Sequence, residues 1–289
     1  MQFNLQLIIS AVLCLSPLAL VLTVVIKQRQ QQKEASRAPF KELQRRPAGE
    51  TCRIKLEALD DKLSEEIMLM LMFPLLMALG LFALHPKDLF SPLLFFILSA
   101  GWSVFFGIRL SKHIRQRANY RLGFEGERFV GEELSCLIFH GFEIYHDVPF
   151  DGFNMDHVLV GPRGVFLIET KTRRKPVDEG GKKEFRVVFD GKCMQWPWGS
   201  DSYGIDQAKN NAKTLATWLS SASGESVWAT PILTLPGWMV DRKAPFDGIY
   251  VLNPKEIYGV CSTSPEKLTE PQIRRICHQL DQKCRIEVT

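Results

Sequence analysis

The fold of this chain is decided by one stretch, residues 154–171, which reads NMDHVLVGPRGVFLIETK. Two apolar runs, 155–160 and 165–170, lie on either side of the turn Gly161-Pro162-Arg163-Gly164. Runs of this length on both sides of a turn rich in Gly and Pro are typical of paired β-strands. The stretch therefore predicts two neighbouring strands of a sheet.

Three chemically active side chains fall on this strand pair. Side chains alternate along a strand, so Asp156 lies on one face of the first strand, and Glu169 and Lys171 share one face of the second. If the strands pair across the turn, the two carboxylates converge on one point with the lysine beside them. Such a point suits a hard cation such as Mg²⁺, which activates water and stabilises charge on a phosphate. The lysine can orient the attacking water or counter the new negative charge.

The tripeptide at the end of the stretch is weak evidence by itself. An acidic residue, any residue and a lysine occur in this order five times, at 60–62, 169–171, 190–192, 241–243 and 281–283. Only the tripeptide at 169–171 ends an apolar strand that follows a second strand carrying an Asp. The alternative is an ion pair at a strand end on a solvated face, which contributes little to stability.

Around this strand pair the sequence alternates between helix and strand patterns. Residues 124–139 predict an amphipathic helix that Gly141 ends. Further strands are expected at 142–148, 185–189, 228–235 and 248–252, and further helices at 205–220 and 270–284. This alternation predicts an α/β domain in which helices flank a mixed sheet.

The amino-terminal part of the chain has a different character. Residues 3–26, 67–84 and 89–108 contain no Asp, Glu, Lys or Arg. At about 1.5 Å per residue, each run crosses most or all of a hydrocarbon layer roughly 30 Å thick. Buried core helices are the alternative, but three such runs within 108 residues favour an all-α membrane region of three transmembrane helices.

Cations beside these runs predict the topology. Residues 27–46 carry seven Lys and Arg and residues 109–121 carry five, whereas the loop 85–88 carries one. By the positive-inside rule, the amino end lies outside and everything after residue 109 is cytoplasmic, as in a protein of an inner or cell membrane. A cleaved signal peptide fits the first run less well, because no Lys or Arg precedes it.

The chain therefore divides into a membrane region, residues 1–120, and a cytoplasmic domain, residues 121–289. Within the membrane region, residues 27–66 form a polar cytoplasmic segment. Leu56, Leu59, Leu63 and Ile67 follow one another at spacings of three and four, which predicts an amphipathic helix running into the second span.

Composition narrows the function classes further. The net charge of +4 divides into +6 for residues 1–120, with 15 Lys and Arg against 9 Asp and Glu, and −2 for residues 121–289, with 21 against 23. The excess of positive charge therefore belongs to the membrane region and indicates its orientation in the membrane. Nucleic-acid binding by residues 121–289 would depend on a local basic cluster. None of the seven cysteines stands in a CxxC pair, which argues against a zinc site.

Three blocks of residues resemble the nuclease-related domain, NERD, a branch of the PD-(D/E)XK restriction-endonuclease-like superfamily. They are Gly126-Glu127, the segment 154–162 and the segment 164–171, and the resemblance covers roughly residues 121–240. It implies a restriction-endonuclease-like fold and a metal-dependent phosphodiesterase. Met155 stands where the superfamily name has Pro, and an aliphatic residue there is usual in the NERD branch.

The resemblance also implies roles for individual residues. Asp156 and Glu169 are expected to bind Mg²⁺ or Mn²⁺, with Lys171 as the catalytic lysine. Glu127 is expected to join them from the first helix, and Glu132 is its competitor. Trp196 and Gln207 match a NERD-like tail motif.

Other residues near the hairpin have weaker interpretations. Gln207 can cap its helix or reach the substrate, and His157 is expected to be packed rather than a ligand. Trp196 and Trp198 suit packing better than base stacking. The basic cluster beside the site is expected to contact phosphate, and it consists of Lys171, Arg173, Arg174, Lys175, Lys182, Lys183 and Arg186.

Together these features predict a membrane-anchored, Mg²⁺-dependent nuclease that acts on nucleic acid, with DNA as the expected substrate. The alternative is a catalytically silent module that binds nucleic acid or a protein at the lipid bilayer, because a fold does not fix an activity. A channel or transporter is a weaker alternative, since the apolar runs contain no charge to line a pathway.

Overall fold

The structure, a computed structural model, describes residue 27 and residues 45–84, 90–176 and 185–285. In this part of the chain, the residues between 57 and 117 belong to one compact unit. Residues 45–56 and the residues from 118 onward belong to a second compact unit. A short segment that includes the start of the first long helix therefore belongs to the α/β unit, and the two units are described separately below.

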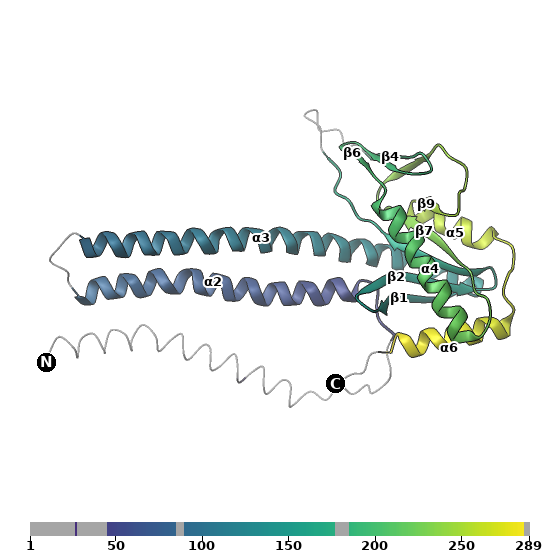
Figure 1. Cartoon of the computed structure of the whole chain (residues 1–289), viewed down its shortest axis with the longest axis horizontal. Helices are drawn as coiled ribbons and strands as arrows, with labels where there is room; N and C mark the ends of the chain where they lie inside the picture. Colours follow the sequence, from purple (N-terminus) through teal and green to yellow (C-terminus); the bar gives the residue numbers. More distant parts are fainter. Residues whose placement is uncertain (1–26, 28–44, 85–89, 177–184, 286–289) are drawn as a thin grey trace. The chain divides into compact units, whose positions relative to one another are not determined.

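Within the described residues, the first unit consists of parts of two long helices. Helix α2 spans Glu50–Leu84 and helix α3 spans Phe90–Leu134 (Figure 1). Both are long and apolar enough to cross a membrane, judged by length and composition. Many of their large apolar side chains are exposed, and Phe82, Phe90 and Phe96 have exposed fractions of 70%, 73% and 70%. The first expected span, residues 3–26, lies outside the described residues, so the structure supports two candidate spans rather than three.

Polar contacts join the two helices within this unit. Glu66 of α2 is buried, and its carboxylate lies 2.9 Å from Nε of Arg109 and 2.8 Å from Nδ1 of His113, both on α3. Nearby, the indole N–H of Trp102 donates to the carbonyl of Leu69 over 2.9 Å. The contacts of Glu66 give a buried carboxylate a cationic partner, Arg109, and a second polar partner, His113, as a buried carboxylate requires.

The helix expected at 124–139 is not a separate element. Helix α3 continues unbroken from the apolar run to Leu134, and a 3₁₀ turn, η1 (Ser135–His140), follows it. Gly141 does end the helical segment, with a φ of 77° that favours glycine. The expectation failed at the start of the helix, because a change from apolar to charged residues alters the surroundings of a helix without breaking its backbone. The helix expected to run into the second span is confirmed by α2.

The α/β unit contains a five-stranded mixed sheet in the order β1-β2-β3-β7-β9. Its strands are β1 (Glu143–Phe150), β2 (Phe153–Gly161), β3 (Gly164–Thr170), β7 (Ala229–Thr234) and β9 (Tyr250–Leu252). The first three pair antiparallel, and β7 pairs parallel with both β3 and β9. The expected strand pair is thus confirmed as β2 and β3.

A smaller four-stranded sheet in the order β6-β5-β4-β8 accompanies it. Of these strands only β4 (Arg186–Phe189) was expected. The unexpected ones are very short: β5 (Met194–Trp196), β6 (Gly199–Asp201) and β8 (Met239–Arg242). Three or four residues give too few alternations to distinguish a strand from a loop.

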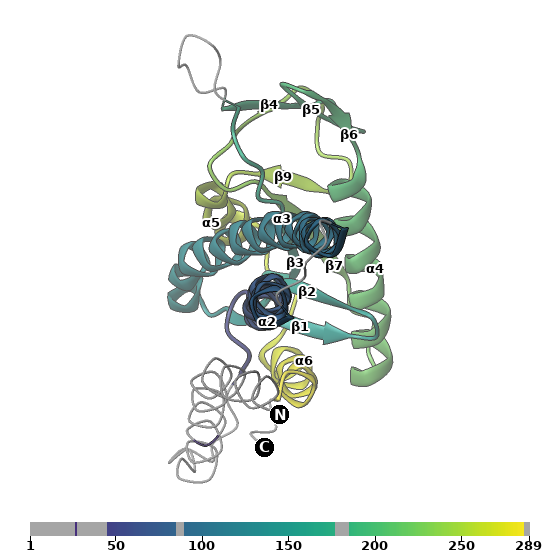
Figure 2. The same cartoon turned by 90° about the vertical axis from the view of Figure 1, so that its left-hand side faces the viewer.

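Helices cover both faces of the main sheet, with α4 on one side and α5 on the other (Figure 2). Helices α4 (Tyr203–Ser223) and α6 (Glu270–Lys283) pack on the face that carries Val158, Val160 and Leu167. The end of α3, together with η1 and the unexpected helix α5 (Pro254–Thr263), packs on the face that carries Leu159 and Ile168. The result is a helical region followed by an α/β domain with a mixed sheet and flanking helices, as expected.

Candidate active site

The carboxylates of Asp156 and Glu169 lie at the end of the β2–β3 pair that is farther from the connecting turn. In the register of this pair His157 stands opposite Ile168, and Asp156 and Glu169 are the adjoining residues on the two strands. Oδ2 of Asp156 accepts a hydrogen bond from the backbone N–H of Thr170 over 2.7 Å. The Asp156 carboxylate therefore reaches across to the end of β3, where Glu169 and Lys171 are located.

Helix α4 closes the other side of Glu169 and Lys171. Nζ of Lys171 donates to Oε1 of Glu169 over 2.9 Å and to Oε1 of Gln207 over 2.8 Å. Nδ2 of Asn211 donates to Oε2 of Glu169 over 3.1 Å. Gln207 thus contacts the lysine instead of capping its helix. Asn211 was not expected, although its place four residues after Gln207 on the same helix face was a usable signal.

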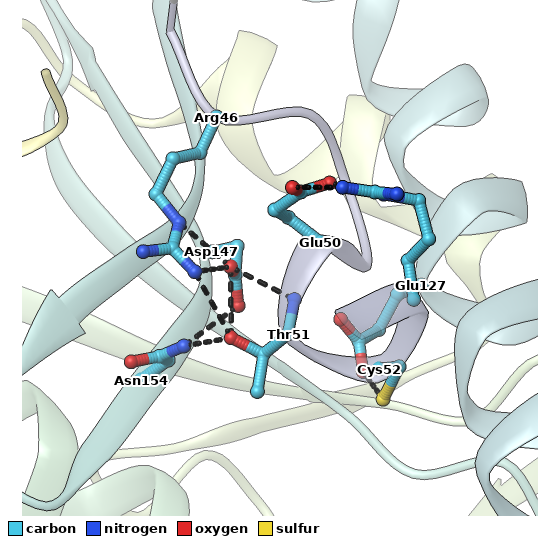
Figure 3. Close-up of polar contacts among 8 residues, drawn as sticks. Arg46, Glu50, Thr51, Cys52, Glu127, Asp147 and Asn154 are labelled. Atoms are coloured by element: carbon cyan, nitrogen blue, oxygen red, sulfur yellow. Dashed lines mark hydrogen bonds and ion pairs between the residues drawn. The ribbon is translucent and has the colours of Figure 1, made fainter. Parts of the chain in front are cut away.

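Glu127 reaches the same region from helix α3. One of its carboxylate oxygens accepts a hydrogen bond from the thiol of Cys52 over 3.3 Å (Figure 3). The charges of Glu169 and Lys171 act on it, so all three groups lie within electrostatic reach. Glu132, its competitor in the sequence, instead pairs with Arg128 on the exposed side of the helix at 3.2 Å.

Gly126 lets α3 approach the site closely enough to deliver Glu127. A Cβ atom at this position would lie 1.8 Å from Oγ1 and 2.9 Å from Cβ of Thr172, just beyond β3. The glycine therefore sets the distance between the helix and the segment that carries Lys171.

Replacing Gly126 with Ala is expected to lower the stability of the full chain by about 1 to 3 kcal/mol, because rotation of the Thr172 side chain cannot relieve the contact with its Cβ. Thermal unfolding in detergent measures the effect. Gly259→Ala in helix α5 is the matched control, since its added methyl group meets no atom within 4 Å. Equal unfolding midpoints for the two variants would contradict the close approach of α3.

Burial and like charges shift the protonation equilibria of the carboxylates. Burial, followed by the charges of Glu169 and Glu127, raises the pKa of Asp156 well above its usual value. Burial also raises the pKa of Glu127 to about 7; the hydrogen bond from Cys52 opposes this shift, and the charges of Asp147 and Glu169 add to it. Strongly perturbed carboxylates beside one another mark candidate functional sites.

Lys171 shows the opposite balance. Burial alone lowers the pKa of its amine, but the charge and hydrogen bond of Glu169 and the charge of Asp156 outweigh it, and the pKa is raised. The amine therefore stays protonated at neutral pH and neutralises part of the carboxylate charge.

The basic residues expected to contact the substrate have different surroundings from one another. Arg173 forms a long ion pair with Asp201, with 3.9 Å between Nη2 and Oδ2. Nη2 of Arg174 donates to the carbonyl of Ala118 over 3.1 Å. Lys175 is exposed, and the end of its side chain lies close to Gly237. Lys182 and Lys183 lie outside the described residues.

The aromatic and histidine candidates are mostly packed. Trp196 is buried and stacks on Trp198, which remains about half exposed. His157 is buried, and its Nδ1 lies 2.8 Å from Nδ1 of His146. Burial lowers the pKa of His157 well below its usual value, so the ring stays neutral, as a packed histidine should.

The carboxylate oxygens of Asp156 and Glu169 are ligands of the kind that a hard divalent cation prefers. Asp156 and Glu169 converge with like charges, and each carboxylate has more acceptor sites than its present hydrogen bonds use. Within the described ranges, no group of three His, Cys, Asp or Glu side chains stands in the arrangement of a ready-made metal site. A cation would therefore be held by these two carboxylates with additional oxygen ligands such as water.

No curated protein and no solved structure matches this chain. A family model does match part of it, from residue 122 to residue 236, and its description is nuclease-related domain, NERD. The matched range includes Glu127, Asp156, Glu169, Lys171 and Gln207. The chain therefore carries, over residues 122–236, a region that matches the nuclease-related domain.

Proposed function

We propose that this protein is a membrane-anchored, metal-dependent nuclease that hydrolyses phosphodiester bonds, with DNA as the expected substrate. The observation that carries the proposal is the hydrogen-bonded group of Asp156, the buried Glu169 and Lys171 at the point where the pairing of β2 with β3 ends. The match to the nuclease-related domain supports it. The PD-(D/E)XK relationship is part of this proposal and accounts for the two acids and the lysine.

The chain's own residues divide the work in this proposal. Asp156 and Glu169 would hold Mg²⁺ or Mn²⁺, and the bound cation would supply charge stabilisation and an activated water. Lys171, kept protonated and held by Gln207, places a positive charge where negative charge develops on the phosphate. Glu127 has a pKa of about 7, so near neutral pH it can accept or release a proton.

Substrate binding is assigned to the basic residues that follow Lys171. Arg173, Arg174 and Lys175 follow Lys171 in the chain, just beyond the end of β3. Their positive charge would hold the phosphate backbone and counter the repulsion between nucleic acid and the acidic side chains. Such contacts carry no sequence information, so a strong sequence preference is not part of the proposal.

Anchoring in the lipid bilayer is assigned to α2 and α3. Their exposed apolar side chains would be costly in water, and a hydrocarbon surrounding removes this cost. Together with the expected span at residues 3–26, they would form the membrane region, residues 1–120. Residues 121–289 would then be cytoplasmic by the distribution of Lys and Arg.

A cleavage assay with defined substrates tests the proposed function. The full chain in detergent is incubated with Mg²⁺ and single-stranded, duplex or branched DNA, or with RNA, and EDTA is the control in each case. We expect cleavage of at least one DNA substrate that EDTA abolishes. No cleavage of any substrate, or equal cleavage in EDTA, would reject a metal-dependent nuclease.

The second candidate is a catalytically silent module that binds nucleic acid or protein at the membrane. The single observation in its favour is that Lys171 and Asn211 already occupy both oxygens of Glu169. Such a module would bind nucleic acid in EDTA as well as in Mg²⁺ and would cleave none. The same substrate set therefore separates the two functions once binding is measured alongside cleavage.

A further inference from the structure

A short segment that ends with the first turns of α2 belongs to the same compact unit as the candidate site. Residues 45–56 belong to this unit although about 60 residues separate them from the rest of it. Arg45 joins the segment to the unit through ion pairs with Glu143 at 2.8 Å and Asp281 at 2.9 Å. Both pairs are half exposed, so they fix the segment only weakly.

A buried carboxylate provides the stronger attachment. Asp147 of β1 has an exposed fraction of 2%, and its Oδ2 accepts hydrogen bonds from the backbone N–H of Thr51 over 3.1 Å and from its hydroxyl over 2.9 Å. Nε of Arg46 donates to the same oxygen over 2.8 Å. Figure 3 shows Arg46, Thr51 and Asn154 directed at this one carboxylate. The carboxylate thus binds the first turn of α2, where free N–H groups favour a negative charge.

The backbone of Asp147 is itself unusual. Its φ of 47° lies in the left-handed region, and among the described residues it is the one non-glycine residue with a positive φ. This conformation costs energy for a residue other than glycine, although Asp tolerates it better than most. In the register of β1 and β2, Asp147 falls between the pairs His146–His157 and Val148–Met155, beside Asp156. The unusual backbone therefore occurs next to the candidate site.

Cys52 follows Thr51 on the same turn and contacts the site. Its thiol donates to Oε1 of Glu127, and its Sγ lies 3.5 Å from the place where a Cβ on Gly123 of α3 would stand. Burial, followed by the charge and the hydrogen bond of Glu127, raises the pKa of the Cys52 thiol to about 12. The thiol thus stays protonated and remains a hydrogen-bond donor.

We infer that residues 46–52 are part of the catalytic unit, with Asp147 anchoring the first turn of α2 and Cys52 acting as a positioning residue for Glu127. This inference rests on the proposed function for the role of Glu127. The anchoring itself depends only on the contacts of Asp147. It follows that a fragment containing only residues 122–236 lacks a piece of its own site.

Cysteine alkylation in the full chain in detergent tests the anchoring without any activity. Mass spectrometry follows the reaction of N-ethylmaleimide with Cys52 and with Cys136, which is exposed and serves as the internal control. In the wild type we expect Cys52 to react at least about tenfold more slowly than Cys136. Asp147→Asn and Arg46→Gln should each accelerate Cys52 at least about fivefold and leave Cys136 unchanged. Equal rates at both cysteines in the wild type, or no acceleration in either variant, would overturn the anchoring.

Cleavage rates test the positioning role. Cys52→Ala should lower kcat about fivefold, since it removes one hydrogen bond to Glu127, and Cys52→Ser should restore it, since the hydroxyl is also a donor. Cys136→Ala is the matched control and should have no effect. An unchanged rate in Cys52→Ala, or equal losses in the Ala and Ser variants, would reject the positioning role. If the wild type cleaves no nucleic acid, the proposed function fails, and the alkylation rates still decide the anchoring.

Discussion

Replacing Lys171 with Met is expected to lower the rate of Mg²⁺-dependent DNA cleavage by about 100- to 1,000-fold. The amine is held by Glu169 and Gln207 in a partly buried position, where a fixed positive charge stabilises developing negative charge more than it would in water. Met keeps the length and most of the volume of the side chain and loses the charge. Single-turnover cleavage of an end-labelled duplex measures the change.

The chain offers a matched control for this substitution. Asp241 and Lys243 repeat the acid and lysine spacing of Glu169 and Lys171, and they form an exposed ion pair at 2.9 Å. Lys243→Met should therefore leave the cleavage rate unchanged. Equal losses in Lys171→Met and Lys243→Met would show that the charge acts through general attraction of nucleic acid and not through the site.

Glu127 is expected to stabilise the folded, metal-free protein more at pH 5 than at pH 8, by on the order of 3 kcal/mol. Burial raises the pKa of this carboxyl from an ordinary value of 4.5 to about 7. Between these two values the folded protein binds a proton that the unfolded chain releases. The stabilisation is therefore fully present below pH 4.5 and is lost as the pH rises through about 7.

Thermal unfolding of the full chain in detergent and EDTA, from pH 5 to pH 8, measures this dependence. Glu127→Gln is the control, because an amide does not titrate and the fall in midpoint should be smaller. The raised pKa of Asp156 acts in the same direction as that of Glu127, and this contribution remains in the variant. Adding Mg²⁺ should raise the midpoint most at pH 8, where the carboxylates are charged. The buried His157 and His146 act in the opposite direction, because their lowered pKa values cost stability as the pH falls, so the prediction concerns the difference between the two proteins. A midpoint that changes with pH equally in the wild type and in Glu127→Gln would contradict the raised pKa of Glu127.

The centre of the site was predictable because its signals are local. The strands β2 and β3 are joined by one short turn, so alternation along each strand was enough to bring Asp156 and Glu169 together. Lys171 lies two residues after Glu169, so the same alternation places it on the same face. Gln207 came only from the resemblance to a tail motif, and its contact with the lysine required the structure.

The remaining parts of the site depend on pairing between distant segments. Thr51 and Asp147 are 96 residues apart, and nothing in the composition of residues 45–53 distinguishes this segment from an ordinary polar loop before a helix. The predicted start of the helix that carries Glu127 was wrong for a related reason. Local patterns report the surroundings of a helix, and α3 passes from one kind of surroundings to another without a break.

The most direct test of the central claim is cleavage of a labelled DNA duplex by the wild type and by Asp156→Asn, both as full chains in detergent with Mg²⁺. Asn keeps the shape of the side chain and can still accept the hydrogen bond from Thr170, but it cannot supply the negative charge that holds a cation. The account predicts cleavage by the wild type and a loss of at least about 100-fold in the variant. Equal cleavage by both proteins would contradict it.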